Sequence, residues 1–240
     1  FIALNKTDAH HCVAQAWVTL PVTCDHSNPI LLSIYRSHFD KWSNPCSGLH
    51  LDSDVYIHEA PPIFVQDTLH FKLCDCFDDR LVGILKYDLS TNCLSLIDMP
   101  LVESIIVDDV ILMAMEDDNL GFAHVGGLVL NLWSRHMGSD GVASWTQRTL
   151  IDLKNLLPVQ NPERRPRLIG SVEGSDTVFV TTDLGIYEIN VKSLRWMKIW
   201  KRENFHALIP YMSFYNQQGI LVFIYVIYCD LATPVKLYSI

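Results

Sequence analysis

The chain has 240 residues, of which 49% are hydrophobic and 19% are charged, and it carries a formal net charge of −9 at pH 7. A chain of this length and hydrophobicity can bury a sizeable core, which excludes general disorder. The acidic balance counts against nucleic acid as a partner, because a nucleic-acid surface needs a basic patch.

Short strands separated by polar turns recur along the chain, and the first recognisable copy is LLSIYRSHFDKWS at residues 31–43. The mostly apolar residues at its start, LLSIY, predict a strand that contains Tyr35. A polar turn follows, and Trp42 lies on the next strand.

The clearest strands begin at Leu69. Here Leu69, Phe71 and Leu73 alternate with less apolar residues, which predicts a strand with one buried face. After a polar turn, a second alternating strand contains Tyr87, and a third ends before Pro100. Three strands joined by tight turns predict an antiparallel meander.

A third copy has the same order with a longer turn, LVLNLWSRHMGSDGVASWTQ at residues 128–147. It predicts one strand with Trp133 and an outer strand with Trp145. The Leu-rich piece that follows, LKNLLP, predicts a short helical turn with Asp152 as its N-cap and Pro158 as its end.

A fourth copy lies at residues 176–200. Val178 and Val180 share one face of a strand, and a hairpin turn ends at Gly185, where glycine tolerates a positive φ. The next strand carries Tyr187. The segments YDLSTNCLSL and YEINVKSLRW overlay without a gap.

The strongly apolar run ILVFIYVIYC, residues 220–229, predicts a buried strand. It is too short to cross a bilayer as a helix, which needs about 20 residues. We therefore expect no membrane partner.

The aromatic residues Tyr35, Tyr87, Trp133 and Tyr187 recur at intervals of about 50 residues, the period of kelch-type propeller blades. The sequence therefore predicts one all-β, kelch-like β-propeller domain over residues 1–240, or most of one, built from blades of three to four antiparallel strands. The expected blade units, followed by tail strands, are residues 10–43, 60–100, 105–158 and 167–200.

Several of these stretches resemble the F-box-associated β-propeller domain of the plant F-box protein family. They are ILKYDLSTNCLSLIDMP, LVLNLWSRHMGSDGVASWTQRTLIDLKNLLP, RLIGSVEGSDTVFVTTDLGIYEINVKSLRWMKIW and IPYMSFYNQQ. The resemblance implies a domain that captures the target of an SCF-type ubiquitin ligase. The ligase adaptor would bind through an F-box outside this chain, because residues 1–240 contain none. The sequence after Gly219 departs from the family.

One basic loop interrupts the acidic chain. The segment PERRPR contains Arg164, Arg165 and Arg167. One interpretation is a solvated connector between blades. The other is a docking point for an acidic partner, since arginine forms bidentate contacts with carboxylates.

Metal sites and cofactors are not expected. The Cys74-Asp75-Cys76 segment lacks a second thiol pair for zinc, so turn residues are the preferred interpretation. A weaker zinc set is formed by His10, His11, Cys12, Cys24 and His26. The acidic runs around Asp78 and Asp117 lack the spacing of a calcium loop and predict solvated hairpin tips.

The seven cysteines are an odd number at irregular spacings. This pattern predicts buried thiols rather than a disulfide scaffold, and a cytoplasmic or nuclear location.

The function predicted from the sequence is therefore a protein-binding module without chemistry of its own. Two alternatives stay open. One is a propeller-fold hydrolase acting on glycans with carboxylates at the mouth of the ring. The other is a divergent or truncated copy that no longer closes or binds.

Overall fold

A computed structural model of the chain describes residues 2–6, 12–19, 31–36, 41–42, 49, 54–58, 60, 62–100, 105–115, 117–161, 163–172, 174–201, 207–213, 222–228 and 236–239. For the strands before residue 49 and after residue 201, the backbone alone is described. The chain divides into two compact units, Phe1–Val107 and Asp108–Ile240. Among the described helices, none is long and apolar enough to cross a lipid bilayer.

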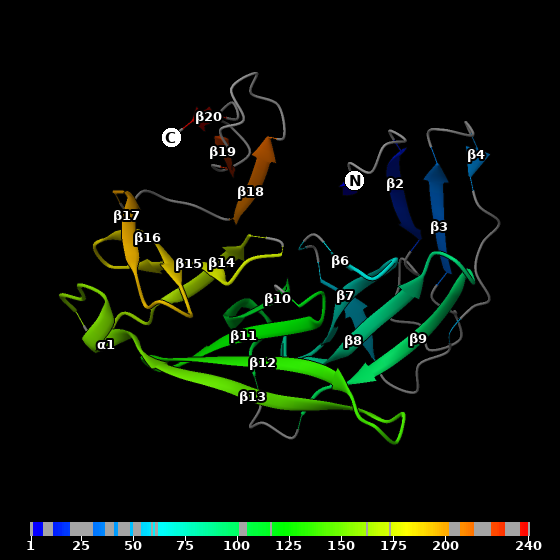
Figure 1. Ribbon diagram of the computed structural model, residues 1–240, viewed down its shortest axis with the longest axis horizontal. Helices are drawn as coiled ribbons and strands as arrows, with labels where there is room; N and C mark the ends of the chain where they lie inside the picture. Colours follow the sequence, from blue (N-terminus) through cyan, green and yellow to red (C-terminus); the bar gives the residue numbers. More distant parts are fainter. Residues whose placement is uncertain are drawn as a thin grey trace. The chain divides into compact units, whose positions relative to one another are not determined.

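Unit 1 contains two antiparallel sheets (Figure 1). The first has the order β1 (Ile2–Lys6), β2 (Cys12–Thr19), β3 (Leu31–Arg36) and β4 (Lys41–Trp42). The second has the order β5 (Val55–Ile57), β7 (Thr68–Asp75), β8 (Leu81–Asp88) and β9 (Cys93–Asp98), with β6 (Ile63–Val65) also paired to β7.

Unit 2 begins within the 3-10 helix η2 (Val107–Asp109) and contains three sheets. The first has the order β10 (Val110–Ala114), β11 (Leu120–Gly126), β12 (Val129–Met137) and β13 (Ala143–Asp152). The second has the order β14 (Arg167–Ser171), β15 (Thr177–Thr182), β16 (Gly185–Asn190) and β17 (Trp196–Trp200). The third has the order β18 (Ala207–Ser213), β19 (Val222–Tyr228) and β20 (Lys236–Ser239).

These sheets confirm the predicted fold class. A four-stranded antiparallel sheet whose strands follow chain order is the blade of a β-propeller. In unit 2 the first strands of successive sheets, β10, β14 and β18, contact one another in that order, as the inner strands of neighbouring blades do. The predicted extent of a single domain is not tested by these contacts and stays a prediction.

The repeated aromatic residues occupy equivalent strands. Tyr35, Tyr87, Trp133 and Tyr187 each lie on the third strand of a four-stranded path, namely β3, β8, β12 and β16. Trp145 lies on the outer strand β13, as predicted. The run at 220–229 forms β19, as predicted, although its side chains lie outside the description.

The segments YDLSTNCLSL and YEINVKSLRW align in sequence without a gap. In the structure, however, the turn of the second hairpin comes two residues later than this alignment predicts. The Asp88 carboxylate opens the β8–β9 turn by accepting bonds from two backbone N–H groups. Asn190 opens the β16–β17 turn in the same way with one such bond. Tyr87 directly precedes its turn, whereas Tyr187 lies two residues further away. Because side chains alternate along a strand, this offset keeps both rings on a buried face.

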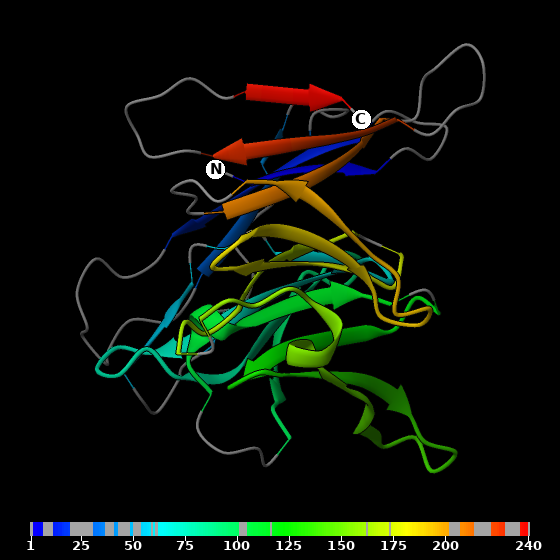
Figure 2. The ribbon, with the colours of Figure 1, turned by 90° about the vertical axis from the view of Figure 1, so that its left-hand side faces the viewer.

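The core of unit 2 lies between the sheet β10–β13 and the sheet β14–β17. Leu130 and Leu132 of β12 belong to the same buried cluster as Val180 of β15 and Tyr187 of β16. Figure 2 shows the two sheets as successive layers. Burial of apolar side chains between them is the main stabilising contribution here.

Strand β7 in unit 1 corrects one prediction. Its expected open face is buried, since His70 and Lys72 are 4% and 8% exposed. The Lys72 ammonium donates a hydrogen bond to the Val107 carbonyl at 3.1 Å. The His70 Nε2 lies 3.3 Å from the Thr68 hydroxyl. Hydrogen bonds of this kind allow polar groups to be buried, and the sequence pattern did not reveal them.

Helix α1 (Leu153–Leu156) confirms the predicted helical turn after β13. The Asp152 carboxylate accepts a hydrogen bond from the Lys154 backbone N–H at 2.9 Å, which makes Asp152 the N-cap. The Leu157 N–H donates to the Leu153 carbonyl at 2.8 Å, and Pro158 follows.

We expect Asp152→Ala to lower the free energy of unfolding by about 1 kcal/mol, because the Lys154 N–H in the first turn of α1 loses its acceptor. Asp152→Ser keeps an acceptor and should cost much less. Urea unfolding of both variants measures the difference. Equal losses in the two variants would contradict a capping role.

Candidate functional site

The connector between the first two sheets of unit 2 lies at one end of both sheets. In a four-stranded meander, the turn between the second and third strands lies at the end where the chain arrives and leaves. We name this the connector end, and it comprises Gly127–Leu128, residues 153–166 and Asp183–Leu184. Figure 1 shows α1 at this end, after β13.

The connector is pinned to the turn of the following sheet. The Asp183 carboxylate accepts hydrogen bonds from the backbone N–H of Gln160 at 3.2 Å and of Asn161 at 2.8 Å. The Thr182 hydroxyl donates to the Pro158 carbonyl at 3.4 Å. These bonds fix the backbone that leads into the arginine loop, so the loop starts from a defined position.

The three predicted arginines are placed differently. Arg164 and Arg165 are exposed at the end of a bend, which the Arg164 N–H closes by donating to the Asn161 carbonyl at 3.1 Å. Arg167 opens β14, and its Nη2 lies 3.1 Å from the Asp108 carboxylate, with both side chains more than half exposed. Within the described residues, neither Arg164 nor Arg165 forms an ion pair. The bend therefore exposes Arg164 and Arg165, whereas Arg167 is held by its ion pair with Asp108.

An acidic residue at the end of η2, directly before β10, lies beside these arginines. Burial raises the pKa of Asp109, and the positive charges of Arg167 and Arg165 partly oppose this rise. The structure thus brings Arg165 and Arg167 together with Asp108 and Asp109. Sequence reasoning missed this pairing, because no local pattern joins residues so far apart in the chain.

A polar network at the opposite end of the first sheet of unit 2 was also missed. The Ser134 hydroxyl lies 2.6 Å from His136 Nε2 and accepts a bond from Arg148 Nε at 2.6 Å. Arg148 also pairs with Asp117 at 3.2 Å, and the Asn119 amide lies 3.3 Å from His136 Nδ1. The contact of Ser134 with His136 has the composition of a nucleophile and its base.

Burial argues against such a catalytic use of Ser134. Its side chain is 0% exposed, and its oxygen is already engaged by Arg148. The network joins the β10–β11 turn to β12 and β13 and therefore holds this end of the sheet together. The only sequence signal was the presence of Ser134 and His136 on the face of β12 that otherwise carries leucines.

The other candidate sites of the sequence have structural roles where they are described. Asp75 accepts from the Phe77 N–H at 2.8 Å, and Asp78 pairs with Arg80, as expected of a solvated hairpin tip. No cluster of potential metal ligands occurs in the described residues. His10, His11, Cys24 and His26 of the weaker zinc set, and the side chain of Cys12, lie outside them.

Among the cysteines whose side chains are described, one corrects the expectation of burial. Cys74 is buried and Cys76 is partly buried, whereas Cys93 is exposed. Cys93 lies at the start of the outer strand β9, where a side chain can face solvent.

Comparisons with known proteins give no family. No family model matches the chain, and no curated protein matches it. One similar solved structure is the extracellular domain of a putative one-component system from Bacteroides thetaiotaomicron, with 15% identity and a TM-score of 0.42 over 88% of this chain and 25% of that chain. Another is the WD40 domain of SCAP from fission yeast, with 11% identity and a TM-score of 0.41 over 88% of this chain and 59% of that chain.

A third is a quinoprotein alcohol dehydrogenase-like protein from Bacteroides thetaiotaomicron, with 13% identity and a TM-score of 0.36 over 99% of this chain and 63% of that chain. The chain thus spans less than two thirds of the length of each of these structures. Similarity at this level carries no argument about function, and the fold rests on the strand order described above.

Proposed function

We propose that this chain is a protein-binding module that takes an acidic segment of its partner at the connector end. The supporting observation is the exposure of Arg164 and Arg165 on a backbone pinned by Asp183. A pinned loop loses less conformational entropy on binding than a mobile one. Guanidinium groups form strong, bidentate hydrogen bonds with carboxylates. The bend is a local positive region on a chain whose net charge is −9.

We also propose a finer role, which rests on the resemblance to plant F-box proteins. In this role the partner is a target of a cullin-type ubiquitin ligase, and the adaptor binds through an F-box outside residues 1–240. A cytoplasmic or nuclear location belongs to the same proposal. Recovery of the adaptor with the full-length gene product, and of a target whose ubiquitination depends on it, would test this role.

Charge reversal at the bend tests the binding site itself. The double variant Arg164→Glu/Arg165→Glu should lose the partner that the unchanged chain captures, with affinity for the purified partner reduced by about tenfold or more. Arg195→Glu is the matched control, because Arg195 is an exposed arginine in a hairpin at the other end of the next sheet. Interferometry with the purified partner measures all three.

Retention of full affinity by the double variant would exclude the bend as the binding site. Equal losses in the Arg195 control would show an effect of overall charge instead. Rising salt should weaken a genuine contact of exposed charges, because counterions screen them.

A hydrolase remains a second candidate, on the basis of Asp109. A carboxyl group whose pKa is raised by burial is what a general acid requires. Glycoside hydrolysis also needs a second carboxylate, and the neighbouring Asp108 is already paired with Arg167, which counts against this role. If the chain hydrolyses a glycan substrate and Asp109→Asn abolishes the hydrolysis, the binding-module proposal gives way to the enzyme.

A further inference from the structure

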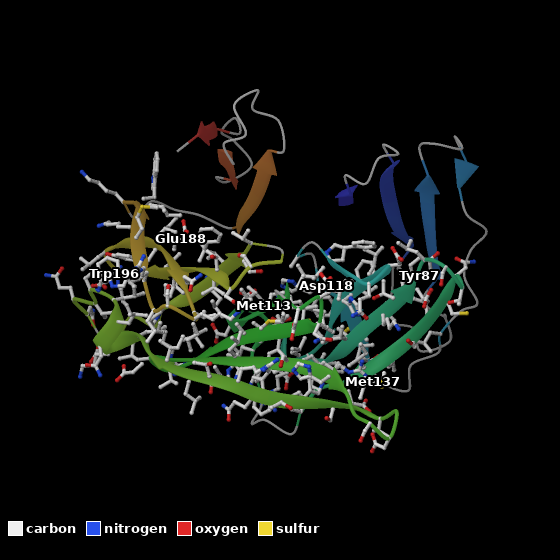
Figure 3. The ribbon with its side chains drawn as sticks, in the orientation of Figure 1. Tyr87, Met113, Asp118, Met137, Glu188 and Trp196 are labelled. Atoms are coloured by element: carbon white, nitrogen blue, oxygen red, sulfur yellow. The ribbon has the colours of Figure 1, made fainter. Side chains whose placement is uncertain are left out.

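The outer strand of the second sheet of unit 2 carries a stretch that is both apolar and basic. β17 is the last strand in the order of that sheet. Residues 194–201, LRWMKIWK, include three basic residues and no acidic one. We name this stretch the basic rim. Figure 3 labels Trp196, the residue with which β17 begins.

Apolar side chains of the basic rim are exposed on both faces of the strand. Leu194, Trp196 and Met197 are 47%, 43% and 49% exposed. Trp196 and Met197 follow one another on β17, so their side chains point to opposite faces of the sheet. A partner that covers both side chains must therefore reach around the strand.

The basic rim is held on an ordered hairpin. The Leu194 N–H donates to the Asn190 carbonyl at 2.9 Å, and the Asn190 N–H donates to the Arg195 carbonyl at 2.9 Å. The Trp196 ring meets the buried ring of Tyr187 edge-on, at 5.6 Å between centroids. These contacts fix the exposed side chains on a rigid support, which lowers the entropy lost on binding.

The charge of the basic rim is positive. Arg195, Lys198 and Lys201 are exposed, and none of the three forms an ion pair within the part of the chain that the structure describes. Glu188 of β16 pairs in register with Met197, so it lies on the face of the sheet opposite Lys198. Although the chain has a net charge of −9, salt screens carboxylates that lie further away than about 8 Å. An anionic partner is therefore the complement of the rim.

We propose that the basic rim binds an anionic phospholipid surface as a peripheral contact. Indole rings favour the boundary between headgroups and acyl chains, and lysine and arginine are attracted to anionic headgroups. Fluid lipids can surround a strand that is exposed on both faces, whereas a rigid protein groove would have to match its shape. The expectation of no membrane partner considered helical spans alone, and a peripheral contact needs none. This site is independent of the proposed connector site.

Cosedimentation of the 240-residue chain with lipid vesicles tests the proposal. We expect binding to phosphatidylcholine vesicles that contain about 30 mol% phosphatidylserine. Vesicles of phosphatidylcholine alone should bind about tenfold more weakly or worse, because the attraction of the headgroups for the three cations is lost. Rising salt should release the chain from the anionic vesicles, since counterions screen exposed charges.

Charge variants locate the contact. Arg195→Gln/Lys198→Gln should weaken binding to the anionic vesicles by about tenfold or more, because two cations of the basic rim are removed. Arg164→Gln/Arg165→Gln removes the same charge at the connector end and should change vesicle binding by less than about twofold, which separates the two sites. Circular dichroism confirms that each variant is folded.

Two further variants test the apolar part of the rim. Met197→Gln should weaken vesicle binding by about threefold, whereas Met137→Gln, at an exposed methionine of β12, should leave it unchanged. Brominated lipids quench the fluorescence of tryptophans that enter the bilayer. Trp196→Phe, which keeps an aromatic ring against Tyr187, should remove most of this quenching.

Five results would overturn the proposal. They are absence of binding to the anionic vesicles, equal binding to the two kinds of vesicle, equal losses in the two double variants, equal losses in the two methionine variants, and quenching that Trp196→Phe leaves unchanged. Binding of soluble polyglutamate without binding of anionic vesicles would identify an acidic polypeptide as the partner instead.

Discussion

Tyr187→Ala is expected to lower the free energy of unfolding by about 3–5 kcal/mol, the range for deletion of a buried aromatic ring. The Tyr187 side chain is 1% exposed and belongs to the cluster between the two sheets of unit 2. Trp196 meets it edge-on at 5.6 Å between ring centroids. The cavity left by the ring is bounded by paired strands, which limit how far the surroundings can collapse.

Tyr187→Phe is the control, because it keeps the ring and removes the hydroxyl alone. It should cost no more than about 1 kcal/mol. Urea unfolding, followed by tryptophan fluorescence and circular dichroism, measures both variants. A cost for Tyr187→Ala below that of Tyr187→Phe would contradict the placement of this ring in the core.

Gly185→Ala is expected to destabilise the chain by about 2–4 kcal/mol, because strain and a steric clash combine. Gly185 begins β16 with φ of +152°, a conformation that residues with a Cβ rarely adopt. A Cβ at this position would overlap the Trp200 carbonyl oxygen on the neighbouring strand. The backbone of the β16–β17 pair would have to move to admit it.

Gly141→Ala provides the comparison, since its φ is also positive, at +77°, but nothing lies within 4 Å of the added Cβ. It should cost about 1 kcal/mol, from conformational strain alone. Thermal unfolding of the two variants separates strain from clash. Similar costs at the two positions would show that the close approach of Trp200 does not constrain the chain.

The candidate sites were only partly predictable. The basic bend was recognisable because Arg164, Arg165 and Arg167 are neighbours in sequence, and their role in binding stays a prediction. The commitment of Arg167 to Asp108 was not recognisable, because it depends on two strand starts that only the packing of β10 against β14 brings together.

The sequence by itself determined the strands, their turns and the helix cap, because these depend on neighbours within a few residues. The alternation around Leu69, the turn before Gly185 and the Asp152 cap are all of this kind. Only the tertiary structure decided whether the second face of each strand is buried and which polar side chains contact one another. Lys72 is enclosed and Ser134 contacts Arg148 because other strands cover them, and the local sequence of a strand does not contain its neighbours.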